Sequence, residues 1–261
     1  MCGKVDRIVN MKKQKKLVVG NWKMNPQTIE DAKQIILIVK RGTKNIRKTE
    51  VVICPPFVYL GSVSELKPHI FLGAQDAFYE SLGSHTGEVS FSELLDFRVN
   101  FVILGHSEKR AKGETDEIIN KKIKSVVNSK MTAIFCVGEK VRDQQGEYLA
   151  VIKKQIVYGL KDISKRFLEN LVIAYEPVWA VDSKEAMRPQ EIHETSIFIK
   201  KILRDMYGVS SSDVRILYGG DVTTDNVSDI MMDGHVNGVL IGRESLRPKD
   251  FVGIIKLVDS I

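Results

Sequence analysis

Three side chains capable of acid–base chemistry follow three different apolar runs of the sequence. Lys23, His106 and Glu176 each stand within three residues of the end of such a run. A carboxylate can take a proton from a carbon next to a carbonyl group. A neutral imidazole can donate a hydrogen bond to the carbonyl oxygen, and an ammonium group can hold an anionic substrate. Each residue alone is unremarkable, but together they predict a proton transfer if the fold brings them into one site.

The elements that must position these residues begin with eight short apolar runs. These runs are 17–20, 51–54, 70–74, 101–105, 133–137, 171–175, 214–218 and 238–242. Continuously apolar runs rich in β-branched residues are typical of strands that are buried on both faces, as in a parallel sheet.

Segments with apolar residues at helical spacing separate many of these runs. The clearest are 28–42, 115–129, 146–163, 189–208 and 223–234. Pro26 is placed to start the first of these helices. The alternation predicts an α/β fold, a closed (β/α)8 barrel over residues 17–261, with an open doubly wound sheet as the alternative. No G-x-G-x-x-G pattern follows the first run, which disfavours a dinucleotide-binding sheet. No linker divides the chain, so we expect a single domain.

If the fold is such a barrel, the functional polar residues should follow the strands directly, because active sites of these barrels lie at the carboxyl ends of the strands. Polar residues stand at five predicted strand ends, namely 21–23, 105–108, 176, 218–221 and 242–245. We therefore expect Lys23, His106 and Glu176 to share one mouth of the barrel.

Composition limits the class of protein. With 43% hydrophobic and 28% charged residues, the chain resembles a globular domain. No apolar run approaches the roughly 20 residues that span a bilayer, and the N-terminus lacks the apolar core of a signal peptide. Of the net charge of +6, +5 falls in residues 1–16, which predicts a flexible basic extension, with a nucleic-acid-binding arm as the alternative. Cys2, Cys54 and Cys136 have no paired or metal-ligand spacing, which indicates a reducing, cytoplasmic setting.

Seven motifs resemble those of the triosephosphate isomerase family and extend the resemblance over residues 17–259. They are GNWKMN (20–25), GAQD (73–76), HTGEVS (85–90), ILGHSEKR (103–110), CVGE (136–139), AYEPVWA (174–180) and YGG (218–220). The resemblance implies the interconversion of dihydroxyacetone phosphate and glyceraldehyde 3-phosphate through an enediolate, a reaction of glycolysis and gluconeogenesis. It implies no metal and no organic cofactor.

The resemblance also assigns roles to individual residues. Glu176 matches the base that moves the proton, and His106 matches the neutral electrophile that polarises the carbonyl. Lys23 matches the cation that attracts the phosphate and the developing negative charge, and Asn21 matches the amide that helps to hold the substrate oxygens. Three further positions match supporting residues: Glu108, Cys136 and Tyr218.

The same resemblance implies a homodimer and a mobile lid. Gln75, Thr86 and Glu88 match the long third loop of the family, which docks into a neighbouring subunit. Loop 73–90 is also too long for a plain strand–helix connection. The segment 177–179 matches the first hinge of the lid that excludes water from the enediolate.

The phosphate site departs from the family at three places. The lid tip, usually Gly-Thr-Gly, reads Asp182-Ser183-Lys184, the serine after YGG is Asp221, and the glycine expected after Gly242 is Arg243. An acid near a phosphate costs Coulomb energy. We therefore predict that Arg243 either pairs with Asp221, so that the two are energetically coupled, or grips the phosphate itself.

Three functions stay open on this basis. The first is an isomerase of triose phosphates with an altered phosphate site. The second is a barrel isomerase that acts weakly or on a different small carbonyl compound, and the third is a barrel retained for binding or scaffolding. The intact set of Lys23, His106 and Glu176 favours the first, with a small phosphorylated substrate and neither nucleic acid nor membrane as a partner.

Overall fold

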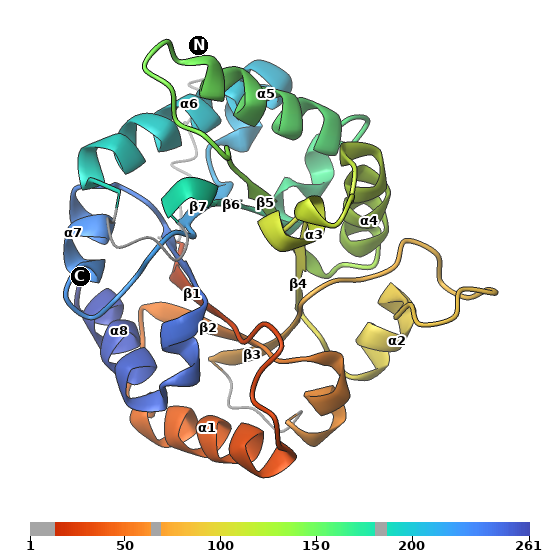
Figure 1. Cartoon of the computed structure of the whole chain (residues 1–261), viewed down its shortest axis with the longest axis vertical. Coiled ribbons are helices and arrows are strands. Elements are labelled where there is room, and N and C mark those ends of the chain that lie inside the picture. The colour runs from red at the N-terminus through yellow and green to blue at the C-terminus, as the bar shows by residue number, and fades with distance from the viewer. Residues whose placement is uncertain (1–13, 64–68, 181–186) are drawn as a thin grey trace, which may run out of the picture.

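The computed structural model describes residues 14–63, 69–180 and 187–261, and these form a closed barrel of eight parallel strands surrounded by helices (Figure 1). The strands follow one another around the barrel in chain order. They are β1 (Lys16–Asn21), β2 (Thr49–Cys54), β3 (Ile70–Ala74), β4 (Phe101–Leu104), β5 (Thr132–Val137), β6 (Leu171–Tyr175), β7 (Arg215–Tyr218) and β8 (Gly238–Ile241). The predicted (β/α)8 barrel is therefore confirmed, and each strand lies within two residues of its predicted range.

The continuous apolar character of the strands follows from the two layers that they separate. In β1, Leu17 and Val19 belong to the cluster that fills the barrel interior. Val18, between them, belongs to the cluster that packs the barrel against the helices. Since successive side chains of a strand point to opposite faces, both faces of each strand must be apolar.

Eight α-helices are defined in the described part of the chain. They are α1 (Ile29–Gly42), α2 (Phe91–Asp96), α3 (Ser107–Ala111), α4 (Asp116–Asn128), α5 (Glu147–Gly159), α6 (Pro189–Tyr207), α7 (Val227–Met232) and α8 (Pro248–Ser260). The prediction that Pro26 starts the first helix is wrong. Thr28 caps α1, because its side chain accepts a hydrogen bond from the backbone N–H of Asp31.

The structure describes only the last residues of the predicted N-terminal extension. β1 begins at Lys16, while residues 1–13 of the predicted basic extension lie outside the described residues. No helix in the described ranges has the length and apolarity needed to cross a bilayer.

One ion pair crosses the inside of the barrel near the start of the strands. Arg215 of β7 donates to Glu50 of β2 over 2.7 Å, although β2 and β7 are not neighbours. Arg215 lies two residues before Leu217 and Glu50 two residues before Val52, and both of these apolar residues belong to the interior cluster. The pair therefore closes the end of the barrel opposite to the predicted site.

Candidate active site

A cavity at the carboxyl ends of the strands brings together the residues expected to do chemistry. It encloses about 530 Å³, including its open mouth. Its lining includes Asn21, Lys23, His106, Glu176, Gly219, Gly220, Asp221, Gly242, Arg243 and Glu244. Lys23, His106 and Glu176 follow β1, β4 and β6, so strands far apart in sequence deliver them to one mouth, as expected.

Glu176 is held from two directions although it is almost fully buried. Its Oε2 accepts a hydrogen bond from the backbone N–H of Ser107, over 3.1 Å, and its Oε1 lies 3.3 Å from Nε2 of His106. A Cβ atom at Gly219 would lie 2.9 Å from the Cγ of Glu176, so only glycine lets the loop after β7 pass this closely. The carboxylate is therefore fixed between two loops of the mouth.

The hydrogen bonds of His106 define its tautomer. The backbone N–H of Glu108, in the first turn of α3, donates to Nδ1 of His106 over 3.2 Å. A nitrogen that accepts a hydrogen bond carries no proton, so the proton of the neutral ring is on Nε2. This N–H points to the side of the ring where Glu176 lies, which suits a hydrogen-bond donor to a substrate oxygen.

Lys23 reaches the cavity from a turn that its neighbours stabilise. Its backbone adopts a φ of 54°, which non-glycine residues rarely adopt. The side chain of the buried Asn21 accepts a hydrogen bond from the Lys23 N–H over 3.0 Å, and Gln75 donates to the Lys23 carbonyl over 2.8 Å. The ammonium group pairs with Glu108 at 2.8 Å, so Asn21, Gln75 and Glu108 together set the position of the cation.

Two predicted supporting residues lie beneath the cavity and not in its wall. Cys136 is fully buried, and burial together with the nearby carboxylate of Glu176 raises the pKa of its thiol well above the ordinary value. Tyr218 is also fully buried, and its hydroxyl passes directly under Gly220, where a side chain would collide with it. Burial raises the pKa of Tyr218. Both groups therefore stay protonated and uncharged near neutral pH.

The residues predicted to form an altered phosphate site are only partly arranged as expected. Asp221 and Arg243 both line the cavity, but no ion pair within the described residues joins them. Asn226 donates to the Asp221 carbonyl over 3.2 Å and accepts from the N–H of Thr223 over 2.8 Å. These bonds hold the backbone of the loop that follows β7. The predicted phosphate contact of Asp182 lies outside the described residues.

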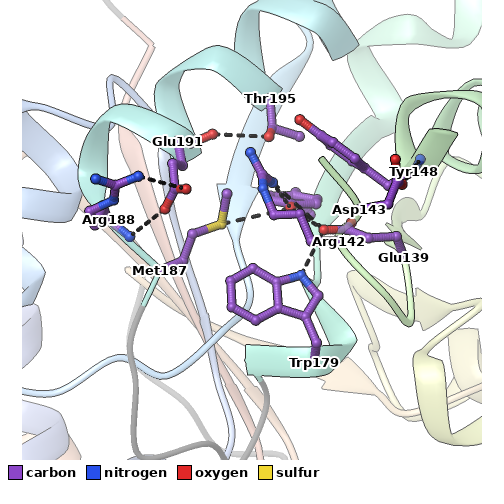
Figure 2. A network of polar contacts seen from close by, with 10 residues as sticks. Glu139, Arg142, Asp143, Tyr148, Trp179, Met187, Arg188, Glu191 and Thr195 are labelled. Carbon is purple, nitrogen blue, oxygen red and sulfur yellow. Dashed lines mark hydrogen bonds and ion pairs between the residues drawn. The ribbon is translucent and has the colours of Figure 1, made fainter. Parts of the chain in front are cut away.

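The structure shows one polar network that the sequence did not reveal (Figure 2). Oε1 of the buried Glu139 accepts hydrogen bonds from Trp179 Nε1 at 2.8 Å and from Tyr175 Oη at 2.9 Å, and Arg142 lies 3.7 Å away. Burial raises the pKa of Glu139. Met187 lies near the same tyrosine, with its sulfur 3.7 Å from Tyr175 Oη. One sequence feature could have indicated this network: the acidic residue Glu139 follows the apolar run 133–137 in the motif CVGE.

The residues expected at a dimer contact divide into two groups. Thr86 and Glu88 are exposed on loop 73–90. Gln75 instead donates to two backbone carbonyls of its own chain, those of Lys23 and Cys54. Gln75 therefore anchors the base of the loop, and only its outer part is free to meet another subunit. Within the described ranges, no group of three or more His, Cys, Asp or Glu residues is arranged to hold a metal ion.

Comparisons with known proteins agree with the geometry. The family model described as "Triosephosphate isomerase" matches residues 16–258. The chain is 40% identical to the triosephosphate isomerase of Endomicrobium trichonymphae over 93% of its own length and 98% of the relative. It is 40% identical to that of Dictyoglomus thermophilum and 41% identical to that of Thermodesulfovibrio yellowstonii, over 93% of this chain and 99% of each relative.

Proposed function

Since the chain belongs to the triosephosphate isomerase family and is an isomerase, we propose that it interconverts dihydroxyacetone phosphate and glyceraldehyde 3-phosphate through an enediolate. One observation carries the proposal. The carboxylate of Glu176 lies 3.3 Å from the Nε2 of a neutral His106, in the cavity that Lys23 also lines. A base, a hydrogen-bond donor and a cation are thus placed around one small volume.

Each group has one task in the proposed reaction. Glu176 takes a proton from the carbon next to the carbonyl and returns it to the neighbouring carbon. The Nε2–H of His106 donates to the oxygen on which negative charge develops, and the ammonium group of Lys23 stabilises that charge. Asn21 supports the substrate oxygens. Glu108, Cys136 and Tyr218 position these groups and do not touch the substrate.

The phosphate end of the substrate is assigned to the part of the cavity wall that is formed by the loops after β7 and β8. Gly242 and Arg243 line this wall, and the planar guanidinium of arginine can bind two phosphate oxygens at once. Asp182, which follows the first lid hinge in sequence, belongs to the same proposed site. Asp221 makes this site less electropositive than a phosphate site built from lysine, arginine and backbone N–H groups alone.

We further assign the protein to the cytoplasm, to glycolysis and gluconeogenesis, and to a homodimer formed through loop 73–90. The basic extension 1–16 is proposed to be a flexible terminus without a role in nucleic-acid binding. No metal and no organic cofactor takes part in the proposed reaction.

Steady-state kinetics with glyceraldehyde 3-phosphate test the proposed function. We expect turnover by the full chain, its loss in Glu176→Gln, and much weaker turnover of unphosphorylated glyceraldehyde. Turnover that survives Glu176→Gln would contradict the assigned mechanism. Preferred turnover of another small carbonyl compound would support the second of the functions that the sequence leaves open.

A further inference from the structure

Asp221 differs from the other carboxylates around the cavity in its hydrogen bonds. Glu108 pairs with Lys23 at 2.8 Å and Glu244 pairs with Arg247 at 3.0 Å. Glu176 accepts from the backbone N–H of Ser107. The carboxylate of Asp221 is half-buried in the cavity wall and makes no hydrogen bond or ion pair with any described residue, since only its backbone carbonyl is bonded.

The charged and titratable groups that line the cavity together with Asp221 do not form a hydrogen bond or ion pair with its carboxylate among the described residues. The cavity lining contributes the cations Lys23 and Arg243, the acids Glu176 and Glu244, and the neutral His106. Beneath the wall lies Tyr218, whose pKa is raised by burial and then by the charge of Asp221. Among the residues that the structure describes, the carboxylate of Asp221 therefore has no donor, and it can accept a hydrogen bond from a bound molecule.

We propose that Asp221 makes this cavity select an oxyanion that carries a proton, so that it binds a phosphate group as its monoanion and discriminates against fully ionised oxyanions such as sulfate. The inference rests on the proposed function, because it takes the cavity wall formed by the loops after β7 and β8 as the phosphate end of the site. It adds the protonation state in which that phosphate binds.

The chemical reason is the pairing of donors with acceptors. A fully ionised oxyanion offers only acceptor oxygens, so its approach to Asp221 sets lone pairs and negative charges against each other. A phosphate monoanion offers one O–H, and an O–H donated to a carboxylate is a short, strong hydrogen bond. The remaining phosphate oxygens stay available to Arg243 and to the backbone N–H groups of the wall. A phosphate monoester takes up this proton near pH 6, whereas sulfate takes up none in the neutral range.

The test is a calorimetric titration of the full chain with inorganic phosphate and with sulfate, at about pH 6 and about pH 8. At the lower pH we expect phosphate to bind at least about tenfold more tightly than sulfate. This is the difference in affinity that one additional hydrogen bond to a charged group produces. Phosphate affinity should then fall as the pH rises, because the protonated ligand is lost. The sulfate titrations report any change that arises from the protein's own titrating groups.

Two variants, each of which removes one negative charge, distinguish an effect of Asp221 in the cavity from an effect of the net charge of the protein. Asp221→Asn replaces the acceptor with an amide that can also donate, so the preference for phosphate should shrink to within about threefold and its decline with pH should vanish. Asp205→Asn removes a charge from an exposed position of α6 and should leave both features unchanged. Because no described residue bonds to the Asp221 side chain, we expect its variant to fold, and a thermal unfolding scan verifies this.

Three results would overturn the inference. They are equal affinity for the two oxyanions in the parent chain, phosphate affinity that rises with pH, and absence of binding by either ion. The proposed function is judged separately, by turnover of glyceraldehyde 3-phosphate. Turnover without oxyanion selectivity removes this inference alone, and selectivity without turnover removes the proposed function alone.

Discussion

At the scale of single residues, the site depends on how a buried carboxylate is held. Glu176 is 3% exposed, and the N–H of Ser107 and the ring of His106 fix the direction of its two oxygens. A buried acid without such partners would be costly. The structure therefore supplies both the burial that excludes water and the donors that orient the carboxylate proposed as the base.

Glu176→Asp tests how much this geometry matters. The shorter side chain retracts the carboxylate by about one methylene, and a misplacement of this size costs about 10²-fold in the chemical step. We expect kcat to fall by this amount while KM changes much less, measured by steady-state kinetics on glyceraldehyde 3-phosphate. An unchanged kcat would remove Glu176 from the role of base.

Glu139 gives a prediction about pH. Burial raises its pKa above the ordinary value of 4.5, so the folded protein favours the protonated form. The stability that this group contributes is present below pH 4.5 and is lost as the pH rises through the raised pKa. The melting temperature of the parent, measured relative to Glu139→Gln, should therefore fall as the pH rises above 4.5.

A second variant checks the cause of that pH dependence. The hydrogen bond from Trp179 lowers the pKa of Glu139 and so partly opposes the effect of burial. Trp179→Phe should therefore move the loss of stability to still higher pH. A difference between parent and Glu139→Gln that does not vary with pH would contradict the assignment.

The sequence predicted the residues whose chemistry depends on type and position after a strand. Lys23, His106 and Glu176 could be placed in one mouth because barrel strands deliver their carboxyl ends to the same side. The N–H of Ser107 could not be predicted, since a backbone donor has no sequence signature. Glu139 was missed because its partners, Tyr175 and Trp179, meet it only through the pairing of β5 with β6.

At the scale of elements, length decided what could be predicted. The long helices show apolar residues at regular spacing, as in α1, where Ala32, Ile35, Ile36 and Val39 are buried. The helices α2 and α3 have six and five residues, too few for such a period. Capping residues set the starts of these two helices. Each cap consists of one or two hydrogen bonds to the first turn, so it involves too few residues to produce a periodic pattern in the sequence.

The cap of α2 is strong enough to test. The Ser90 side chain accepts from the N–H of Glu93, and Glu93 in turn accepts from the N–H of Ser90. The hydrogen bonds that the Glu93 carboxylate accepts from the N–H and from the hydroxyl group of Ser90 lower the pKa of Glu93. Ser90→Ala should cost about 1 kcal/mol of stability, measured by denaturant unfolding, whereas Ser84→Ala in the exposed loop should cost much less. Equal losses in the two variants would mean that the cap does not hold α2.

At the scale of the whole molecule, the Arg215–Glu50 pair ties opposite sides of the barrel together. Arg215 is 8% exposed, so removing it leaves Glu50 without its donor inside the barrel. Arg215→Met should destabilise the fold by about 3 kcal/mol in denaturant unfolding. The double change Arg215→Met with Glu50→Gln should recover part of this loss, because the uncompensated charge is gone. Simple addition of the two effects would exclude coupling across the barrel.

The last prediction concerns the assembly, because three loops at the mouth expose large apolar side chains. Met24, Val58 and Leu82 are 91%, 80% and 83% exposed, and they lie on the loops after β1, β2 and β3. Large apolar side chains that are exposed on the loops of neighbouring strands are typical of an interface. Met24 also lines a cavity of about 940 Å³, a volume that includes its open mouth, together with residues of loop 73–90, of the loops after β1 and β2, and of the segment 108–112. We expect this cavity to receive the outer part of loop 73–90 from a second copy.

We therefore expect the full chain to sediment as a homodimer, and Leu82→Asp to weaken it by placing a charge in the buried contact. Val209→Asp, on an equally exposed valine before β7 at the opposite end of the barrel, should leave the dimer intact. Because Gln75 joins the base of the loop to the carbonyl of Lys23, dissociation should also lower turnover. A stable, fully active monomer at nanomolar concentration would show that these exposed side chains serve no contact between copies.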